Sequence, residues 1–173
     1  MTKRSDAGFT LIELLIVVAI ISIIAAIAVP GLLRARMTGN ETSAIASLKV
    51  TTSSQVAYSS ACGNGAYAAT YVVLGTSPSP GGQGFISADL GQAVTPTKSG
   101  FTLSMGGGAG SAAGPNDCNG TATITTYLAT AIPMALGTTG TRSFAVNAGN
   151  TIWQLTGGAA PTEPFGAPAT PIQ

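Results

Sequence analysis

The sequence predicts an α+β protein in which a long N-terminal α-helix packs, over its second half, on a small antiparallel β-sheet. An apolar run from Phe9 to Val29 contains Glu13 as its only ionisable residue, which indicates a helix suited to an apolar environment. After about residue 62 the chain changes to short alternating segments rich in Thr, Ser and Gly, a composition typical of strands joined by turns. With 173 residues, we expect one folded domain beside this helix.

Charged side chains are scarce in this chain. They make up 8% of the residues, against roughly 25% in typical soluble domains, and the formal net charge is +1. No basic cluster occurs, so binding to nucleic acid is not expected. A weakly charged surface suits a protein packed against copies of itself, and it equally suits a secreted protein.

The apolar run is long enough to cross a membrane. As a helix it rises about 1.5 Å per residue and spans roughly 31 Å, close to the bilayer core of about 30 Å. A carboxylate in such a segment costs on the order of 2–3 kcal/mol, so Glu13 calls for a partner. The S/T-x-x-E pattern from Thr10 to Glu13 predicts one, a capping box at the helix start.

The residues around this helix start carry a family resemblance. A leader with Lys3 and Arg4 is followed by the run GFTLIELLIVVAIISIIAAIAVP. Over about residues 1–60 this resembles type IV prepilins and type II secretion pseudopilins, and the rest agrees only in general layout. The resemblance implies a pilin-like fold, cleavage after Gly8 by an inner-membrane prepilin peptidase, and N-methylation of Phe9 by the same enzyme. It also implies that Glu13 of one subunit neutralises the Phe9 amine of the next during assembly.

Alternatives to this processing and pairing remain open. Ala26-Ile27-Ala28 satisfies the A-x-A pattern of conventional signal cleavage, which would release a chain that starts at Val29. Glu13 could instead pair with the Phe9 amine of its own chain, or serve only as a cap. The positive-inside rule gives no orientation, because basic residues flank the run on both sides.

Breaks in the helix are expected after the apolar run. Pro30 lacks a backbone donor and crowds the preceding turn, and Gly31 weakens the helix further, so the helix should kink or open there. Gly39 interrupts the pattern again, within a second possible capping box from Thr38 to Glu41. We therefore expect unwinding between Pro30 and Thr38, in keeping with a locally melted segment in related pilin filaments. The alternative is a continuous, gently bent helix.

Helical periodicity resumes after Pro30 and marks one apolar stripe. We expect this stripe to be the seam between the helix and the sheet. Its members are Leu33, Met37, Ala44, Ile45, Leu48, Thr52 and Val56.

Cys62 and Cys118 are the only cysteines. In a secreted chain they favour a disulfide, which would close a loop of about 56 residues and contribute roughly 4 kcal/mol at most. Two free thiols or a redox pair are the alternatives.

Four segments are expected to form the sheet. They are residues 101–105, 122–129, 142–146 and 152–155, which alternate with period two or are rich in β-branched residues. Residues 147–150 should form the turn of a hairpin. The tail, residues 161–173, is rich in Pro and Ala and is expected to be an extended strap or disordered.

Candidate catalytic residues are lacking. The chain has no His, and its acidic residues beyond the helix, Asp89, Asp117 and Glu163, are far apart in sequence. The Gly-rich segments at 81–84 and 106–108 lack the Lys and the strand–turn–helix setting of a phosphate loop. We therefore predict no catalytic site, no metal site and no cofactor.

Together, these patterns predict four regions. They are a cleaved leader (residues 1–8), a transmembrane and filament-core helix (9–29), its continuation (30–61), and a β-rich head with a Pro-rich tail (62–173). By its resemblance, the chain is expected to be a non-enzymatic subunit of a type IV pilus-like filament.

The expected partners are further copies of itself, the prepilin peptidase, the inner-membrane assembly machinery and membrane lipid. The subunit pool should lie in the inner membrane and the filament outside the cell or in the periplasm. The alternatives are a type II secretion pseudopilin and a membrane-anchored periplasmic binding module that does not polymerise.

Overall fold

The computed structural model describes residues 8–172, so the leader residues Lys3 and Arg4 lie outside the described part of the chain. The chain divides into two compact units, one that ends at Arg36 and one that begins at Met37. Helix α1 (Leu11–Ala61) contributes to both units. The two units are described separately below.

The structure describes residues 8–36 of the first unit, which include the N-terminal part of α1, and all their side chains are exposed. Its most apolar window of 18 residues has a mean hydropathy of 3.0 and none of that window is buried. By length and composition α1 can therefore cross a membrane. The exposed apolar surface needs an environment that this unit does not provide by itself.

Helix α1 continues without interruption through Pro30, Gly31 and Gly39. The expected opening at these positions is therefore absent from the isolated subunit, and the alternative of a continuous helix describes it. One missing donor at Pro30 removes one hydrogen bond, and the long apolar helix on either side tolerates that loss. Unwinding of this stretch within a filament stays a prediction.

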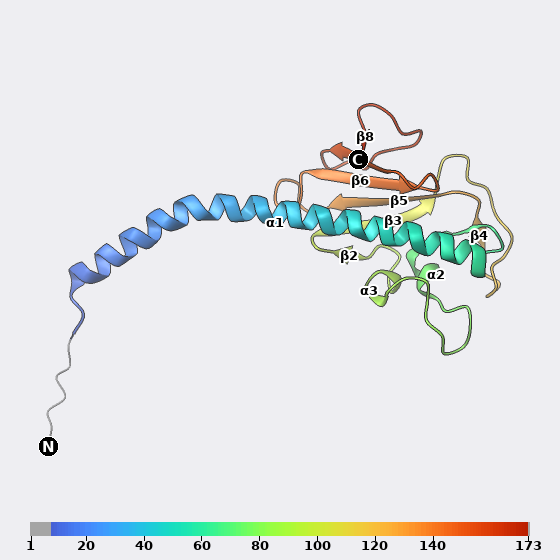
Figure 1. The fold of residues 1–173 in the computed structure, drawn as a ribbon, viewed down its shortest axis with the longest axis horizontal. Coiled ribbons are helices and arrows are strands. Elements are labelled where there is room, and N and C mark those ends of the chain that lie inside the picture. Colours follow the sequence, from blue (N-terminus) through green and yellow to red (C-terminus); the bar gives the residue numbers. More distant parts are fainter. Residues whose placement is uncertain (1–7, 173) are drawn as a thin grey trace, which may run out of the picture. The chain divides into compact units, whose positions relative to one another are not determined.

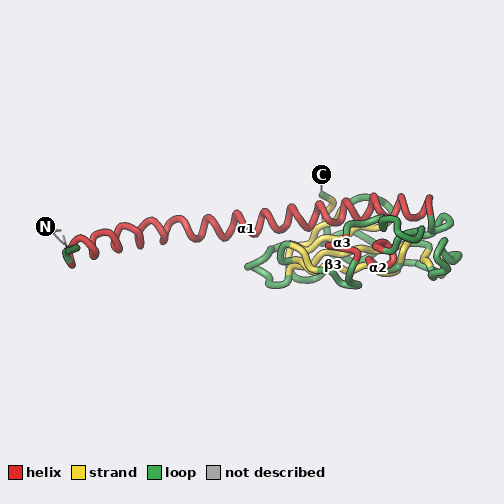
Figure 2. Tube along the Cα trace, turned by 90° about the horizontal axis from the view of Figure 1, so that it is seen from below, coloured by secondary structure: helices red, strands yellow, loops and turns green. Residues whose placement is uncertain are grey.

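The second unit, the head, consists of the rest of α1, two short helices and two sheets. Figures 1 and 2 show this part of α1 lying along one face of the larger sheet, with α2 and α3 beside it. The larger sheet is antiparallel in the order β2-β3-β5-β6-β7-β8, and β1 pairs with β4 in the smaller one. Their bounds are β1 (Tyr67–Ala68), α2 (Tyr71–Gly75), α3 (Ala88–Gly91), β2 (Thr97–Lys98), β3 (Phe101–Gly107), β4 (Thr123–Ile124), β5 (Tyr127–Pro133), β6 (Arg142–Asn147), β7 (Ile152–Thr156) and β8 (Thr170–Pro171).

The predicted α+β layout is confirmed, with differences in the strands. The segment 101–105 is the start of β3, whereas 122–129 is divided between β4 and β5, which belong to different sheets. The larger sheet also has six strands instead of about four, because the two-residue strands β2 and β8 complete it at its edges. Two residues are too few to show a period-two pattern in the sequence.

The hairpin between β6 and β7 forms at the expected place. Val146 pairs with Ile152, and the four residues 147–150 make the turn. The backbone N–H of Asn150 donates to the carbonyl of Asn147 at 3.0 Å, and Asn150 itself adopts a positive φ of 61°. Asn tolerates this left-handed conformation better than most residues, which explains its place at the end of the turn.

The core lies between α1 and the sheet. Strand β3 contributes alternate side chains, Phe101, Leu103 and Met105, as its period-two pattern requires. From α1, Leu48 and Tyr58 are fully or almost fully buried against this layer. The cluster is completed by side chains of α2, α3, β5 and β6, including Tyr71, Leu74, Leu90, Tyr127 and Phe144.

The buried face of α1 differs from the apolar stripe expected for it. Ala44 and Leu48 are buried as predicted, but Leu33 and Val56 are 50% and 52% exposed. Polar residues occupy much of the seam instead: Glu41, Ser47, Thr51, Ser54 and Gln55. The prediction was wrong on this point because it scored only hydrophobicity, whereas the head supplies hydrogen-bond partners for these side chains.

The tail forms an ordered strap. Strand β8 pairs with β7, and the N–H of Ile172 donates to the carbonyl of Ile152 at 2.8 Å. The rings of Trp153 and Phe165 stack with centroids 5.3 Å apart. The Glu163 carboxylate accepts a bond from Ala109 N at 2.5 Å and another from the Asn147 side chain. Of the two alternatives left by the sequence, the extended strap is the one observed.

The disulfide expected from the sequence is present between Cys62 and Cys118, whose Cα atoms are 4.8 Å apart. It joins the end of α1 to the loop before β4, with 56 residues between the two positions. The N–H of Cys118 also donates to the carbonyl of Cys62 at 2.8 Å. The crosslink therefore holds the C-terminal end of α1 to the head.

Replacing both cysteines with serine should lower the free energy of unfolding by up to about 4 kcal/mol, the loop-entropy value for a closure of this length. Urea titration of the full chain in detergent, followed by the fluorescence of the single Trp153, measures the change. The exposed neighbour Ala61→Ser is the control and should leave the midpoint in place. An unchanged midpoint in the double variant would contradict this role.

Candidate functional site: the helix start and the polar seam

The start of α1 forms a capping box. The Glu13 carboxylate accepts bonds from the backbone N–H and the hydroxyl of Thr10 at 2.9 and 2.6 Å, and the N–H of Glu13 donates to the Thr10 hydroxyl at 3.3 Å. Both bonds to the carboxylate end on the same oxygen, Oε2. The cap predicted from the sequence is thus present, and it uses one of the two oxygens of Glu13.

The two residues at the expected processing point are both exposed. Phe9 is 81% exposed, and a side chain at Gly8 would meet nothing within 4 Å. No contact within the described chain therefore requires glycine at position 8. The ion pairs of residues 8–172 are Asp89 with Lys98 and Glu41 with Arg142, neither of which involves Glu13.

An ion pair between buried Glu41 and half-buried Arg142 holds the beginning of the head's part of α1. The Arg142 Nε and Nη2 atoms donate to Glu41 Oε2 at 2.9 and 2.6 Å. Glu41 Oε1 accepts bonds from the backbone N–H groups of Thr141 and Arg142 at 2.7 and 3.1 Å. The Glu41 side chain is 6% exposed and that of Arg142 is 37% exposed. We call this arrangement the Glu41 clamp.

The second capping box that the sequence allows from Thr38 to Glu41 does not form in this structure. Since α1 is continuous, no helix start exists at Thr38, and Glu41 turns to the head instead. Burial raises the pKa of Glu41, but the bonds from the Thr141 backbone and from Arg142 outweigh it and hold the pKa below its ordinary value of 4.5. The carboxylate is therefore ionised in the folded head at neutral pH.

Further along the seam, α1 pairs with the backbone and side chains of the head. Gln55 donates to the carbonyl of Ala68 at 2.8 Å and accepts from its N–H at 2.9 Å. Thr51 shares a hydrogen bond of 3.1 Å with the Tyr71 hydroxyl. The Tyr58 hydroxyl donates to Asp117 at 2.8 Å. Sequence reasoning missed these residues, because a single polar residue in a helix carries no signal of its distant partner.

The carboxylates of the head do not form a catalytic pair. Asp89 binds Lys98 at 2.6 Å. Asp117 accepts bonds from Tyr58 and from the backbone of Asn119, in the turn that follows Asp117. Glu163 accepts the bond from Ala109 N described for the tail. Burial raises the pKa of Asp117, but the bond from Tyr58 and the backbone bonds from Thr121 and Asn119 lower it overall. Each carboxylate is thus occupied in a separate structural contact.

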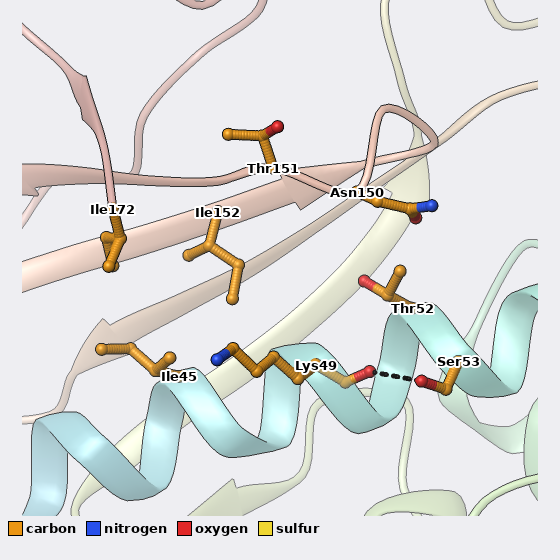
Figure 3. A pocket seen from close by; sticks show the side chains of 8 residues that line it. All are labelled: Ile45, Lys49, Thr52, Ser53, Asn150, Thr151, Ile152 and Ile172. Carbon is orange, nitrogen blue, oxygen red and sulfur yellow. Dashed lines mark hydrogen bonds between the residues drawn. The ribbon is translucent and has the colours of Figure 1, made fainter.

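A shallow groove of about 460 Å³ lies between α1 and the β6–β7 turn. Figure 3 shows Lys49 extending over this groove from α1, opposite Ile152 and Ile172, while Ser53 donates to the Lys49 carbonyl at 3.1 Å. Among the described residues that line it, Lys49 has the only ionisable side chain. Without a second titratable group, the groove offers no acid–base pair.

Fold and helix start together define a class of protein. A long exposed apolar helix with a capped start, continued into a head with an antiparallel sheet, is the layout of a pilin-type subunit. Residues 3–29 match the family model of the prokaryotic N-terminal methylation motif. No solved structure matches the chain.

One curated relative adds to this assignment. Over 39 residues the chain is 62% identical to the "Type IV wide pilus major component PilA4" of Thermus thermophilus, a match that covers 22% of this chain and 30% of that protein. The motif and this relative support the type IV pilin family for the N-terminal part of the chain. They also support a pilin-type structural subunit.

The Glu41 clamp predicts how the stability of the head depends on pH. Because the pKa of Glu41 is lowered on folding, its contribution is present above 4.5 and is lost as the pH falls through the folded pKa. Glu41→Gln should lower the free energy of unfolding at pH 7 by about 2 kcal/mol and reduce its acid dependence.

Urea titrations of the full chain between pH 3 and pH 7 measure both effects. The control is Asp89→Asn, whose ion pair with Lys98 is exposed and should contribute at most about 1 kcal/mol. Equal losses in the two variants at neutral pH would contradict a special role of the buried pair.

Proposed function

We propose that this protein is the structural subunit of a type IV pilus-like filament, cleaved after Gly8, methylated at Phe9 and assembled through α1. The methylation motif over residues 3–29 is the observation that carries this proposal. The precursor and the subunit pool lie in the inner membrane, and the filament lies outside the cell or in the periplasm. Its partners are copies of itself, the prepilin peptidase, the assembly machinery and membrane lipid.

The exposed apolar helix gives this proposal a physical basis. Lipid buries the surface of residues 9–29 before assembly, and neighbouring helices bury it afterwards. Lipid tails are as apolar as leucine, so this transfer gains little from the hydrophobic effect. A specific polar contact can therefore decide whether a subunit joins the filament.

Glu13 is suited to make that contact. Its carboxylate uses Oε2 in the capping box, so Oε1 remains for a second donor. Cleavage after Gly8 creates an ammonium group on Phe9, and a charge removed from water is stable only when it is paired. We propose that Glu13 of one subunit binds the Phe9 amine of the next while it still caps its own helix.

The runner-up proposal is a pseudopilin of a type II secretion system, because the N-terminal motif does not separate the two. The weakly charged head favours the pilus. Among residues 8–172, no group of three or more acidic, Cys or His side chains gathers as a cation site. An anchored binding module that does not polymerise is the third proposal, and in it Glu13 is only a cap.

Processing predicts a defined N-terminus. Mass spectrometry of the mature N-terminal peptide, from membrane and sheared-filament fractions separately, should find N-methylated Phe9 in both. The same peptide confined to the membrane would favour the pseudopilin or the anchored module. A chain that starts at Val29 would mean conventional secretion and would overturn the filament.

Assembly predicts different effects of two variants at the helix start. Glu13→Gln keeps an acceptor for the cap but loses the charge, so filament yield should fall at least tenfold while the membrane pool persists. Thr10→Ala breaks the cap but keeps the carboxylate, so filaments should still form. Immunoblots of sheared and membrane fractions measure both. Normal filament yield from Glu13→Gln would refute the intermolecular role.

A further inference from the structure

Two asparagines of this chain begin an N-x-T triplet, the acceptor pattern for N-linked glycans. Asn40-Glu41-Thr42 lies within α1, and Asn119-Gly120-Thr121 lies in the turn before β4. The two triplets share the pattern, but one lies in a helix and the other in a turn. We propose that Asn119 is an N-glycosylation site, modified by an oligosaccharyltransferase that uses a polyprenyl-diphosphate-linked oligosaccharide.

The turn presents Asn119 at the surface. Asn119, Gly120 and Thr121 are all exposed, and Gly120 has a positive φ of 78°. Asp117 holds the turn from beneath, since its Oδ1 accepts bonds from the N–H groups of Asn119 and Thr121 at 2.9 and 2.7 Å. An acceptor asparagine must extend from the protein surface into the active site of the enzyme. An exposed turn that is held by hydrogen bonds to Asp117 permits this.

The Asn119 side chain is weakly held. Its Nδ2 donates to the carbonyl of Ser77 at 3.2 Å in an exposed position. Breaking this bond costs little, because water or the enzyme replaces the partner. The amide that must react is therefore accessible in the folded head.

Asn40 provides an internal comparison. Its side chain is half-buried and donates at 3.1 Å to the carbonyl of Thr139, in the loop between β5 and β6. The middle residue of its triplet is Glu41, which the clamp buries against Arg142. The backbone is helical on both sides, so this triplet cannot enter an enzyme without unfolding the seam.

The transfer step balances without a further reactant. The Asn119 amide nitrogen attacks the anomeric carbon of the first sugar, the bond from that carbon to the diphosphate oxygen breaks, and polyprenyl diphosphate leaves. One amide proton passes to a base of the enzyme. The product is an N-glycosidic bond, and no atom is oxidised or reduced.

The head has a physical use for such a group. Its charged side chains beyond Lys49 are Asp89, Lys98, Asp117, Arg142 and Glu163, and each is engaged in a contact described above. A glycan on Asn119 adds a large hydrated group at the end of the head where the disulfide joins Cys118 to the end of α1. It leaves the apolar helix uncovered. This proposal rests on the export of the head in the proposed function.

The test is to produce the full chain in cells that carry a periplasmic oligosaccharyltransferase and its lipid-linked oligosaccharide. Trypsin should separate the two triplets, since residues 37–49 contain Asn40 and residues 99–142 contain Asn119. The expected result is a shift of the 99–142 peptide by the mass of the oligosaccharide and no shift of the 37–49 peptide. Intact glycopeptides must be weighed, because Asn-Gly sequences also deamidate spontaneously.

Matched variants tie the shift to the triplet. Thr121→Ala should abolish it completely and Thr121→Ser should retain it, whereas Asn40→Gln should change nothing. Thr121 is exposed, and both of its variants keep the bond of 2.7 Å from its backbone N–H to Asp117 Oδ1. Thr121→Ser also keeps the hydroxyl that bonds Asp117, which Thr121→Ala loses. A shift that survives Thr121→Ala would contradict the assignment.

The same digest separates failure of this proposal from failure of the proposed function. The disulfide-linked peptides of Cys62 and Cys118 report export, and the N-terminal peptide reports processing. An exported, disulfide-bonded chain with unmodified Asn119 overturns the glycan and leaves the filament subunit standing. A glycosylated chain that starts at Val29 supports the glycan and overturns the filament subunit. A reduced, unmodified chain contradicts export and overturns both.

Discussion

The rest of this structure depends on one constraint: an apolar helix whose own chain gives it nothing to pack against. Residues 9–36 expose their side chains throughout, whereas the buried side chains of α1 all lie beyond Met37. Exposed apolar surface of this extent is unstable in water, so lipid or other proteins must cover it. The two parts of one helix therefore face different kinds of surroundings. The first is apolar with a single capped carboxylate, and the second carries a polar seam.

The polar seam sets the position of α1 along the head. Glu41, Thr51, Gln55 and Tyr58 each bind a partner at a fixed place, spread over several helical turns. A slip of one turn, about 5.4 Å, would separate these pairs at once and leave buried polar groups without partners. Apolar contacts alone would resist such a slip far less, because they depend little on direction. The seam thus buries less apolar surface than an apolar stripe would, but it fixes one position of α1 along the head.

Local patterns predicted the local features of the protein well. The capping box at Thr10 and Glu13, strand β3 and the β6–β7 hairpin depend on residues close in sequence, and all three are present. The Glu41 clamp joins residues 101 positions apart, and the seam contacts of Thr51, Gln55 and Tyr58 join residues 13 to 59 positions apart. No periodicity in the sequence reports such pairs. At Pro30 the local pattern predicted too much. Proline disfavours a helix at that position, but α1 is long enough to continue through it. Binding of Glu13 to a second subunit depends on contacts between chains, which no pattern within one chain describes.

The edges of the larger sheet limit how copies of this protein can associate. Both edge strands, β2 and β8, are two residues long, and they carry Lys98 and Pro171 respectively. Short edges that bear a lysine or a proline are poor templates for another strand, since they offer few free backbone groups in line. Edge-to-edge pairing of this sheet with the sheet of another copy is therefore disfavoured at both edges. The filament proposed above would therefore have to grow through contacts between α1 helices, and not by adding strands to the edges of this sheet.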